Sequence, residues 1–135
     1  MSILASIGIL LIRILIGLSF IGHGAQKLFG SFGGHGLEGT GGFFESIGIK
    51  PGKTMALIAG LSEFVGGLLF LLGLLTPIGS LLIIVTMVMA IVKVHGSNGF
   101  WATSNGYELN LLYLVAALAG AFTGAGAYSL DALFF

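Results

Sequence analysis

Four long apolar runs limit what this chain can fold into. They lie at about residues 3–26, 54–75, 77–94 and 107–123. Each approaches the ~20 apolar residues that a helix needs to cross a bilayer, whereas strands average only ~5–6 residues. No alternation at period two suggests a β-barrel, and backbone groups in hydrocarbon must be paired within their own segment. The runs therefore predict an all-α fold, a polytopic membrane four-helix bundle.

The composition agrees with a lipid environment. Only 7% of the 135 residues are charged and 56% are hydrophobic, whereas a soluble domain carries ~25% charged residues. Four crossings and their loops use nearly the whole chain, so we expect a single transmembrane domain over residues 1–135. The zero net charge argues against a nucleic-acid partner. The absence of cysteine rules out disulfides and thiol chemistry.

The segments between and within the apolar runs suggest how the bundle is connected. The first run lacks a basic n-region and a cleavage site, so we interpret it as a retained helix. A glycine-rich polar loop, residues 22–53, follows it, and within this loop residues 43–48 predict a short interfacial helix that begins near Thr40 and forms a lid. Glycines inside the runs suit close helix packing, with a homo-oligomer face as the alternative.

The lysines indicate the orientation in the membrane. With four crossings, Lys27, Lys50, Lys53 and Lys93 all fall on one side of the bilayer. Basic residues favour the cytoplasmic side. We therefore expect a multi-pass membrane protein with both polar loops in the cytoplasm and both termini outside.

Two charged residues lie near the middle of apolar runs. An unpaired charge at the bilayer centre costs at least ~2.5–3.5 kcal/mol, so Arg13 and Glu63 are predicted to contact each other between two antiparallel helices. The pair could be structural, fixing helix register, or it could form a buried site for a ligand headgroup or a proton. Phe20 lies on the same helical stripe as Arg13 and Lys27 and could hold a flat ring.

A second polar cluster is predicted at the lysine-bearing side of the membrane. Its members end or begin apolar runs, and they are His23, Gln26, Lys27, Lys93, His95, Trp101, Glu108 and Asn110. They could converge on one cavity, or they could form an ordinary interfacial belt. Glu108 could pair with Lys93 or His95, or accept a proton. The candidate catalytic residues are Arg13, Glu63, His95 and Glu108, without assigned roles.

Cofactor signals are weak. His23 and His95 could ligate a haem from opposite sides, but two histidines on separate helices are poor evidence for one. The chain carries no metal-binding spacing, no dinucleotide fingerprint and no phosphate loop. We therefore expect no metal site and no intrinsic cofactor.

The chain resembles the DoxX family in motifs that cover nearly its whole length. They include Arg13-x-x-x-Gly17-x-x-Phe20-x-x-His23-Gly24-x-x-Lys27-Leu28-Phe29-Gly30, Phe32-Gly33-Gly34, Gly39-Thr40-x-x-Phe43-Phe44, Glu63-Phe64-x-Gly66-Gly67, Gly73-Leu74-x-Thr76, Met89-Ala90, His95, Gly99-Phe100, Gly106-x-Glu108 and Ser129-Leu130-Asp131. The resemblance implies a four-helix inner-membrane protein. DoxX relatives are linked to quinone-dependent oxidoreductases and to resistance against catechols, quinones and oxidative stress.

Two hypotheses follow. In the first, the chain is a quinone-linked redox or detoxification component, such as an oxidoreductase subunit, whose polar groups bind a quinone while a redox partner protein supplies electrons. In the second, it is a non-catalytic membrane scaffold or small-molecule carrier whose charge pairs serve stability. Loss of quinone binding in Glu63→Gln or Arg13→Ala, with the bundle still folded, separates the two.

Overall fold

The fold is all-α. A computed structural model covers residues 1–135 and contains no strand. Its main helices are α1 (Ile3–Phe29), α3 (Gly52–Leu72), α4 (Thr76–Ala90) and α5 (Glu108–Thr123). A π-helical turn, η2 (Ile91–His95), and a 3-10 turn, η3 (Gly96–Asn98), continue α4, so that the continuous helix runs over Thr76–Asn98.

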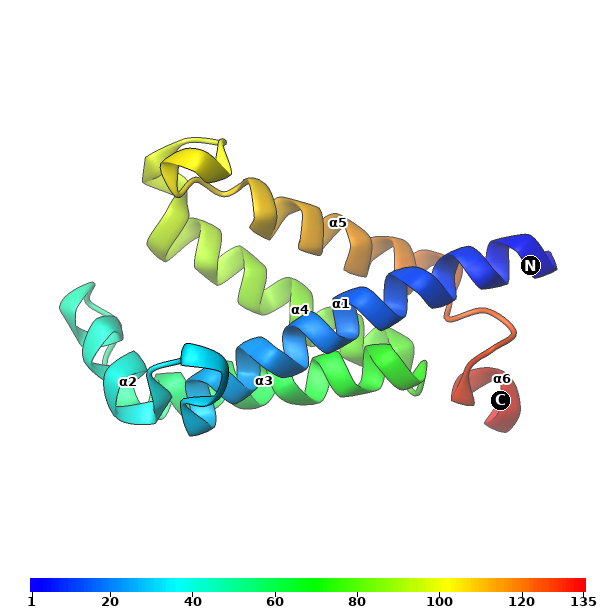
Figure 1. Ribbon diagram of the computed structural model, residues 1–135, viewed down its shortest axis with the longest axis horizontal. Helices are drawn as coiled ribbons and strands as arrows, with labels where there is room; N and C mark the ends of the chain where they lie inside the picture. Colours follow the sequence, from blue (N-terminus) through cyan, green and yellow to red (C-terminus); the bar gives the residue numbers. More distant parts are fainter.

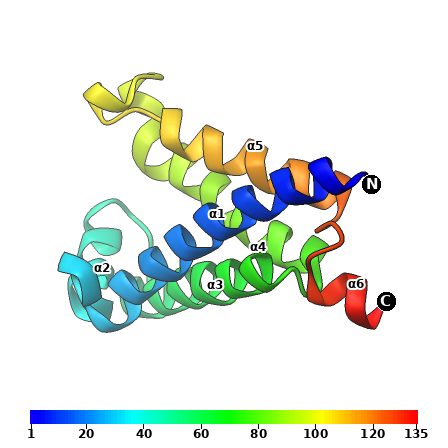
Figure 2. The same ribbon diagram turned by 45° about the vertical axis from the view of Figure 1, so that its right-hand side comes forward.

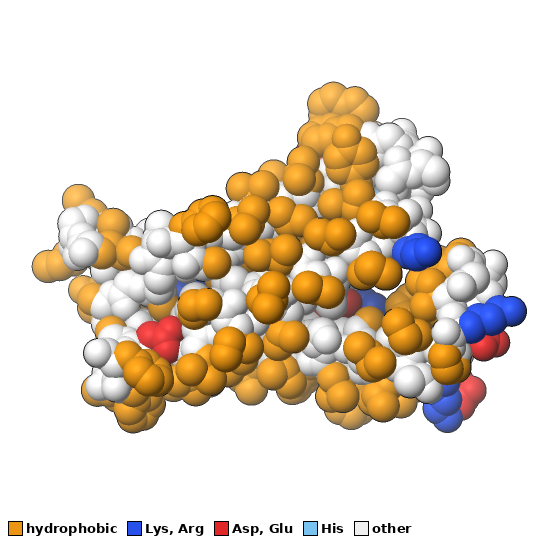
Figure 3. Space-filling view, turned by 180° about the vertical axis from the view of Figure 1, so that it is seen from behind, with side chains coloured by type: hydrophobic (Ala, Val, Ile, Leu, Met, Phe, Trp, Pro, Cys, Tyr) orange, Lys and Arg blue, Asp and Glu red, His pale blue; other side chains and the backbone are white.

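These elements make a membrane bundle, as predicted. Three helices, Ile3–Phe29, Gly52–Leu72 and Thr76–Asn98, are long and apolar enough to span a bilayer. The fourth, α5, has 16 residues, about 24 Å at ~1.5 Å per residue, which is shorter than a hydrocarbon core of ~30 Å. Large apolar side chains cover the outside of the molecule (Figure 3). The outside of the bundle is therefore suited to contact with lipid chains and not with water.

The helices form a wedge that is closed at one end. Both termini lie at one end of the bundle in Figure 1, together with the turn between α3 and α4. We call this the termini end, and the opposite end, with Lys27, Lys50, Lys53 and Lys93, the lysine end. Figures 1 and 2 both show α4 and α5 diverging from α1 and α3 toward the lysine end.

Glycines bring α1 and α3 into close contact along their length. A Cβ added to Gly24 would lie 2.6 Å from the backbone nitrogen of Phe64, and one added to Gly17 would lie 2.7 Å from Leu71 Cβ. Helices in lipid associate by packing rather than by hydrophobic collapse, and small residues permit this approach. The two helices therefore form the rigid half of the wedge.

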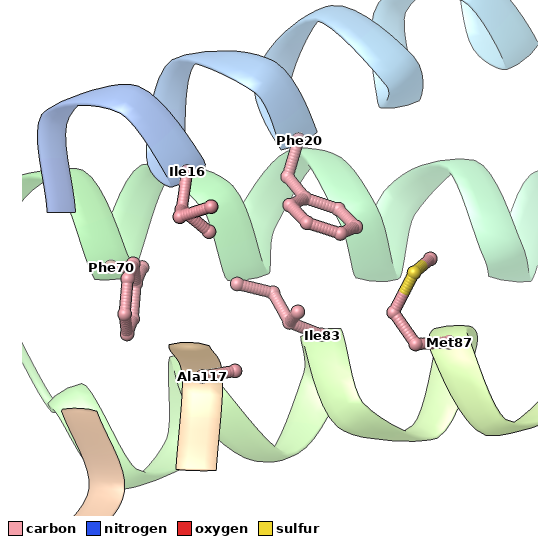
Figure 4. Close-up of a cluster of buried hydrophobic side chains, with 6 residues drawn as sticks. All are labelled: Ile16, Phe20, Phe70, Ile83, Met87 and Ala117. Atoms are coloured by element: carbon pink, nitrogen blue, oxygen red, sulfur yellow. The ribbon is translucent and has the colours of Figure 1, made fainter. Parts of the chain in front are cut away.

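A cluster of buried apolar side chains closes the wedge in its middle. Figure 4 shows its members, Ile16, Phe20, Phe70, Ile83, Met87 and Ala117, which come from all four main helices. Phe20, Phe70, Ile83 and Ala117 are completely buried. The cluster separates the open lysine end from the termini end.

The segment between α1 and α3 folds into a lid. It contains a 3-10 turn, η1 (Ser31–Gly33), and α2 (Gly36–Ser46), which begins before the predicted start near Thr40. The carboxylate of Glu38 lies 2.7 Å from the ammonium of Lys53 at the start of α3. This ion pair holds the pKa of Glu38 below its usual range, through the hydrogen bond first and the charge of Lys53 second.

α5 leads back to the termini end, where the C-terminal tail lies. A loop containing the 3-10 turn η4 (Ala102–Ser104) precedes α5 at the lysine end. After α5, the final helix, α6 (Leu130–Phe134), packs beside the turn between α3 and α4. Asp131 in α6 accepts hydrogen bonds from the backbone nitrogens of Leu75 and Thr76, at 2.7 and 3.0 Å. It therefore caps the start of α4, whose own cap position offers no side-chain acceptor.

Candidate functional site

A cavity occupies the open lysine end of the wedge. Its volume is about 820 Å³, and α1, α2, α3, α4 with η2, and α5 all contribute to its wall. Ligand-binding cavities commonly measure ~300–1,000 Å³. Figure 3 shows a hollow between the upper and lower parts of the molecule, with acidic and basic side chains visible in its depth.

An ion pair forms part of the polar wall of this cavity. The Lys27 ammonium lies 2.8 Å from Oε1 of Glu63, and the Glu63 side chain is only 5% exposed. No hydrogen bond within the chain uses the other carboxylate oxygen, Oε2. Lys27 keeps further N–H donors, because an ammonium has three. The pair can therefore offer both a donor and an acceptor to a ligand.

The antiparallel arrangement of α1 and α3 explains why these two residues meet. Side chains on a helix lean toward its N-terminus. Lys27 sits near the end of α1 and leans back into the bundle, whereas Glu63 leans toward the start of α3 at the lysine end. The two side chains therefore converge from opposite directions.

The predicted contact between Arg13 and Glu63 is wrong for the same reason. Arg13 leans toward the termini end and Glu63 away from it. The register of the helices also separates the two residues, because α1 is opposite α3 at Gly17 with Leu71 and at Gly24 with Phe64. The prediction assumed that the midpoints of the two runs face each other.

Arg13 is held by backbone carbonyls. It is 2% exposed, and its guanidinium donates hydrogen bonds of 2.9 to 3.1 Å to four oxygens, those of Phe70, Leu71, Ala125 and Tyr128. The first two are carbonyls of the last turn of α3, where helical hydrogen bonding ends; the Phe70 carbonyl also accepts from the backbone nitrogen of Gly73 at 3.2 Å. Arg13 therefore ties α1 to α3 and to the C-terminal tail, and it lies outside the cavity.

His23 presents one ring nitrogen without a protein partner. Its Nδ1 lies 3.2 Å from Oε1 of Gln26, and Nε2 of Gln26 donates to the carbonyl of Phe32 at 3.2 Å. Since Nε2 of Gln26 is used in this second bond, the Gln26 atom that faces His23 is the amide oxygen, which can only accept. Nδ1 of His23 must therefore carry the proton. In the neutral ring, Nε2 is then left as an acceptor, and His23 lines the cavity.

Aromatic side chains support this part of the wall. Tyr113 lines the cavity and meets Phe20 edge to face, with ring centroids 5.1 Å apart, while Phe20 also contacts His23 at 5.9 Å. Phe20 itself is completely buried behind them. It supports the wall and does not face a ligand, contrary to the expectation that it would hold a ring. No hydrogen bond within the chain uses the Tyr113 hydroxyl.

The rim of the cavity carries further predicted residues. Lys93 and His95 lie on the π-helical turn η2 and line the cavity, as does Asn110 on α5. Nδ1 of His95 lies 2.9 Å from the carbonyl of Asn105, so it donates and leaves Nε2 free. π-helical turns often occur at functional sites, and nothing in the local sequence predicts this one.

Besides Arg13 and Phe20, two further predicted residues lie away from the cavity wall. Trp101 is 65% exposed and packs edge to face on Phe100. Oε1 of Glu108 accepts a hydrogen bond of 3.0 Å from the backbone nitrogen of Ala102. Of the two alternatives for Glu108, the ion pair with Lys93 or His95 does not form. Glu108 stabilises the loop before α5.

Sequence reasoning missed part of the wall. Thr40, Phe43 and Phe44 come from α2, and Ser62, Thr86 and Tyr113 come from the bundle helices. The two phenylalanines were predicted to belong to a lid, which α2 confirms in part. Tyr113 lies in the middle of an apolar run, and its hydroxyl was the signal that could have identified it. No group of three His, Asp or Glu side chains that could hold a metal ion comes together.

The comparisons with known proteins point to one family. The DoxX family pattern matches residues 8–96. CatD of Bacillus subtilis, whose given name marks it as a proposed oxidoreductase, is 34% identical over 96% of this chain and 88% of its own length. An uncharacterized membrane protein of Mycobacterium tuberculosis is 32% identical, over 91% of this chain and 78% of its own length. The inner membrane protein YqjF of Escherichia coli is 33% identical, over 96% of this chain and 94% of its own.

No solved structure matches the chain. The family pattern runs from within α1 to the end of the π-helical turn η2, and this stretch includes His23, Lys27 and Glu63. The relatives match almost the full length of the chain, so the likeness extends to α5 and the tail. This chain is a membrane protein of the DoxX family.

Proposed function

We propose that this protein binds a quinone-type ring in the cavity at its lysine end, as a component of quinone-linked redox or detoxification chemistry in the plasma membrane. One observation supports this most directly. A mostly apolar cavity of about 820 Å³ has several polar side chains on its wall, and these offer both donors and acceptors. A quinone and its reduced form need that combination, because the first accepts hydrogen bonds and the second also donates them.

Each polar group has a role in this proposal. Lys27 and the Tyr113 hydroxyl donate to a carbonyl oxygen of the quinone. Glu63 Oε2 and His23 Nε2 accept from the hydroxyls of the reduced form. His23 and Glu63 are also types of side chain that exchange protons with a bound ring. The chain binds and orients the ring and moves protons, while electrons come from a redox partner protein.

The name of one relative gives additional support. CatD of Bacillus subtilis is described as a proposed oxidoreductase, which agrees with chemistry on a redox-active ligand. The Lys27–Glu63 pair also costs free energy to bury. A purely structural pair could be replaced by apolar side chains, whereas a ligand site needs the charges.

The experiment compares two carboxylates. Purified protein in lipid nanodiscs is titrated with a decyl-tailed benzoquinone, and binding is followed by difference absorbance. In Glu63→Gln we expect affinity to fall at least tenfold, because Lys27 loses the carboxylate that holds its ammonium in position to donate to the quinone carbonyl. Glu38→Gln is the matched control, since Glu38 also pairs with a lysine but does not line the cavity.

The outcomes separate the hypotheses. Unchanged affinity in Glu38→Gln together with the loss in Glu63→Gln supports the proposed site. Equal affinity in both variants and in the unaltered chain would place the ligand elsewhere. No binding by the unaltered chain would contradict the proposed function and favour a scaffold role.

A further inference from the structure

α3 and α4 touch closely at the termini end only. A Cβ added to Gly66 would lie 3.0 Å from Leu82 Cβ, and one added to Gly79 would lie 3.0 Å from Leu69 Cβ. Toward the lysine end, α4 has no further glycine and carries the larger Ile83 and Met87 on its inner face. Close approach therefore stops, and the two helices diverge (Figure 2).

The divergence leaves an opening in the wall of the cavity. Ile58 of α3 and Val85 of α4 both line the cavity and are each 52% exposed, and Met89 of α4 is 43% exposed. A residue that lines the cavity and also faces outward marks its edge. The edges on α3 and α4 are made of apolar side chains.

This opening faces lipid. Ile58 lies within the apolar span Gly52–Leu72, and Val85 and Met89 lie within Thr76–Asn98. Both spans are long enough to cross the bilayer, so the opening is at hydrocarbon depth. The opposite edge of the cavity, on α1 and α5, carries one apolar residue, Leu109, which is also 52% exposed, together with the polar His23, Lys27 and Asn110. Polar side chains of α3, α4 and η2 complete the inner wall, namely Ser62, Glu63, Thr86, Lys93 and His95.

The cavity therefore has polar groups on its inner wall and, between α3 and α4, an apolar edge that is open to the membrane. We infer that its ligand is a lipid-dissolved quinone with an alkyl or isoprenoid tail, and that the tail leaves through the gap between α3 and α4. The ring lies among His23, Lys27, Glu63 and Tyr113, and the tail passes between Ile58 and Val85. This inference depends on the proposed quinone binding and adds the class of quinone and its path.

Large side chains at the gap test this path. Ile58→Trp and Val85→Trp narrow the gap, while Leu61→Trp and Leu81→Trp place the same ring on lipid-facing positions of the same helices, 46% and 59% exposed, that do not line the cavity. Each variant is titrated in nanodiscs with two probes, the decyl-tailed benzoquinone and its tail-less ring.

In the gap variants we expect affinity for the decyl-tailed probe to fall at least tenfold, and affinity for the tail-less ring to change less than twofold. The control variants should bind both probes like the unaltered chain. If the gap variants bind the decyl-tailed probe unchanged, or lose both probes equally, the tail path is wrong. The proposed ring site then still stands as long as Glu63→Gln abolishes binding of the tail-less ring.

A second measurement does not depend on the bulk of tryptophan. The chain has no cysteine, so Ile58→Cys and Leu61→Cys each provide a single thiol for labelling by a lipid-soluble maleimide. The decyl-tailed probe should slow labelling at position 58 at least fivefold and leave position 61 unchanged. Equal labelling rates with and without the probe at position 58 would overturn the tail path.

Discussion

At the residue scale, the buried charged residues have two separate roles, one for Arg13 and one for the Lys27–Glu63 pair. Arg13 satisfies carbonyls at the termini end, and the pair lines a cavity at the lysine end. Both arrangements lower the cost of a charge inside the membrane. The first fixes the fold, and the second leaves hydrogen-bonding capacity free for a ligand.

Replacement of Arg13 tests this division. Arg13→Gln removes several of the four hydrogen bonds and leaves buried carbonyls unpaired, each at ~1–3 kcal/mol. We expect the free energy of unfolding to fall by at least about 2 kcal/mol, measured by circular dichroism during denaturation with sodium dodecyl sulfate. The folded fraction should bind the quinone probe within twofold of the unaltered chain. Normal stability with lost binding would show that Arg13 acts in the site.

Asp131 gives a prediction about pH. Burial raises its pKa, but hydrogen bonds from the Thr76 side chain and from the backbone of Thr76 and Leu75, with the charge of Arg13, outweigh this and hold the pKa of Asp131 below its usual range. A carboxyl whose pKa is lowered by folding stabilises the protein above its unfolded pKa of ~3.9, and this contribution is lost as the pH falls through the folded value.

The unaltered chain should therefore lose stability as the pH falls below about 4. This loss should be larger than the loss that Asp131→Asn shows over the same pH range. At pH 7, removing this helix cap with Asp131→Ala should cost ~0.5–2 kcal/mol. Thermal unfolding in detergent at several pH values measures both effects. Parallel pH profiles in the two proteins would show that Asp131 does not carry this dependence.

At the element scale, the contact between α1 and α3 depends on glycine. At Gly24 an added Cβ would lie 2.6 Å from Phe64 N and 2.8 Å from Gly60 O, and neither backbone atom can move alone. The same helix has Gly8, where nothing lies within 4 Å of an added Cβ. One helix thus contains glycines that pack and a glycine that does not.

The two kinds of glycine should respond differently to alanine. Gly24→Ala and Gly17→Ala force α1 and α3 apart and should destabilise the bundle by ~1–3 kcal/mol. Gly8→Ala should leave stability unchanged or raise it slightly, because alanine favours a helix over glycine. Unfolding by dodecyl sulfate measures all three. A loss of stability in Gly8→Ala as large as in Gly24→Ala would contradict the packing argument.

At the scale of the whole molecule, the ends of the bundle differ in charge and in openness. The lysine end carries the cavity and the lid α2, while the termini end is closed by Arg13 and by α6 (Figure 1). Positive charge favours the cytoplasmic side. The cavity should therefore open toward the cytoplasmic half of the membrane, the side from which the proposed redox partner would reach its rim.

Single cysteines test this orientation in intact bacteria. Ser97→Cys lies in η3 at the lysine end and Ser2→Cys precedes α1 at the termini end, both exposed. A membrane-impermeant maleimide should label position 2 in intact cells and position 97 only after lysis. The opposite pattern would reverse the orientation.

The class of fold follows from the sequence alone. The length of the apolar runs and the scarcity of charge require membrane helices, and the lysines place both polar loops at one end. The sequence also indicated that His23, Lys27, Lys93, His95 and Asn110 could share a cavity, because each residue ends or begins a run. These features depend on hydrophobicity and on order along the chain, which the sequence states directly.

Which charges meet depends on how the helices pack. Glu63 pairs with Lys27 instead of Arg13 for two reasons. Glycine contacts between α1 and α3 set the register of the two helices, and side chains lean toward the N-terminus of each antiparallel helix. The cavity itself arises from the divergence of α4 and from a π-helical turn that no local pattern marks. Depth, direction and distance between helices are properties of packing, and packing depends on all the helices together.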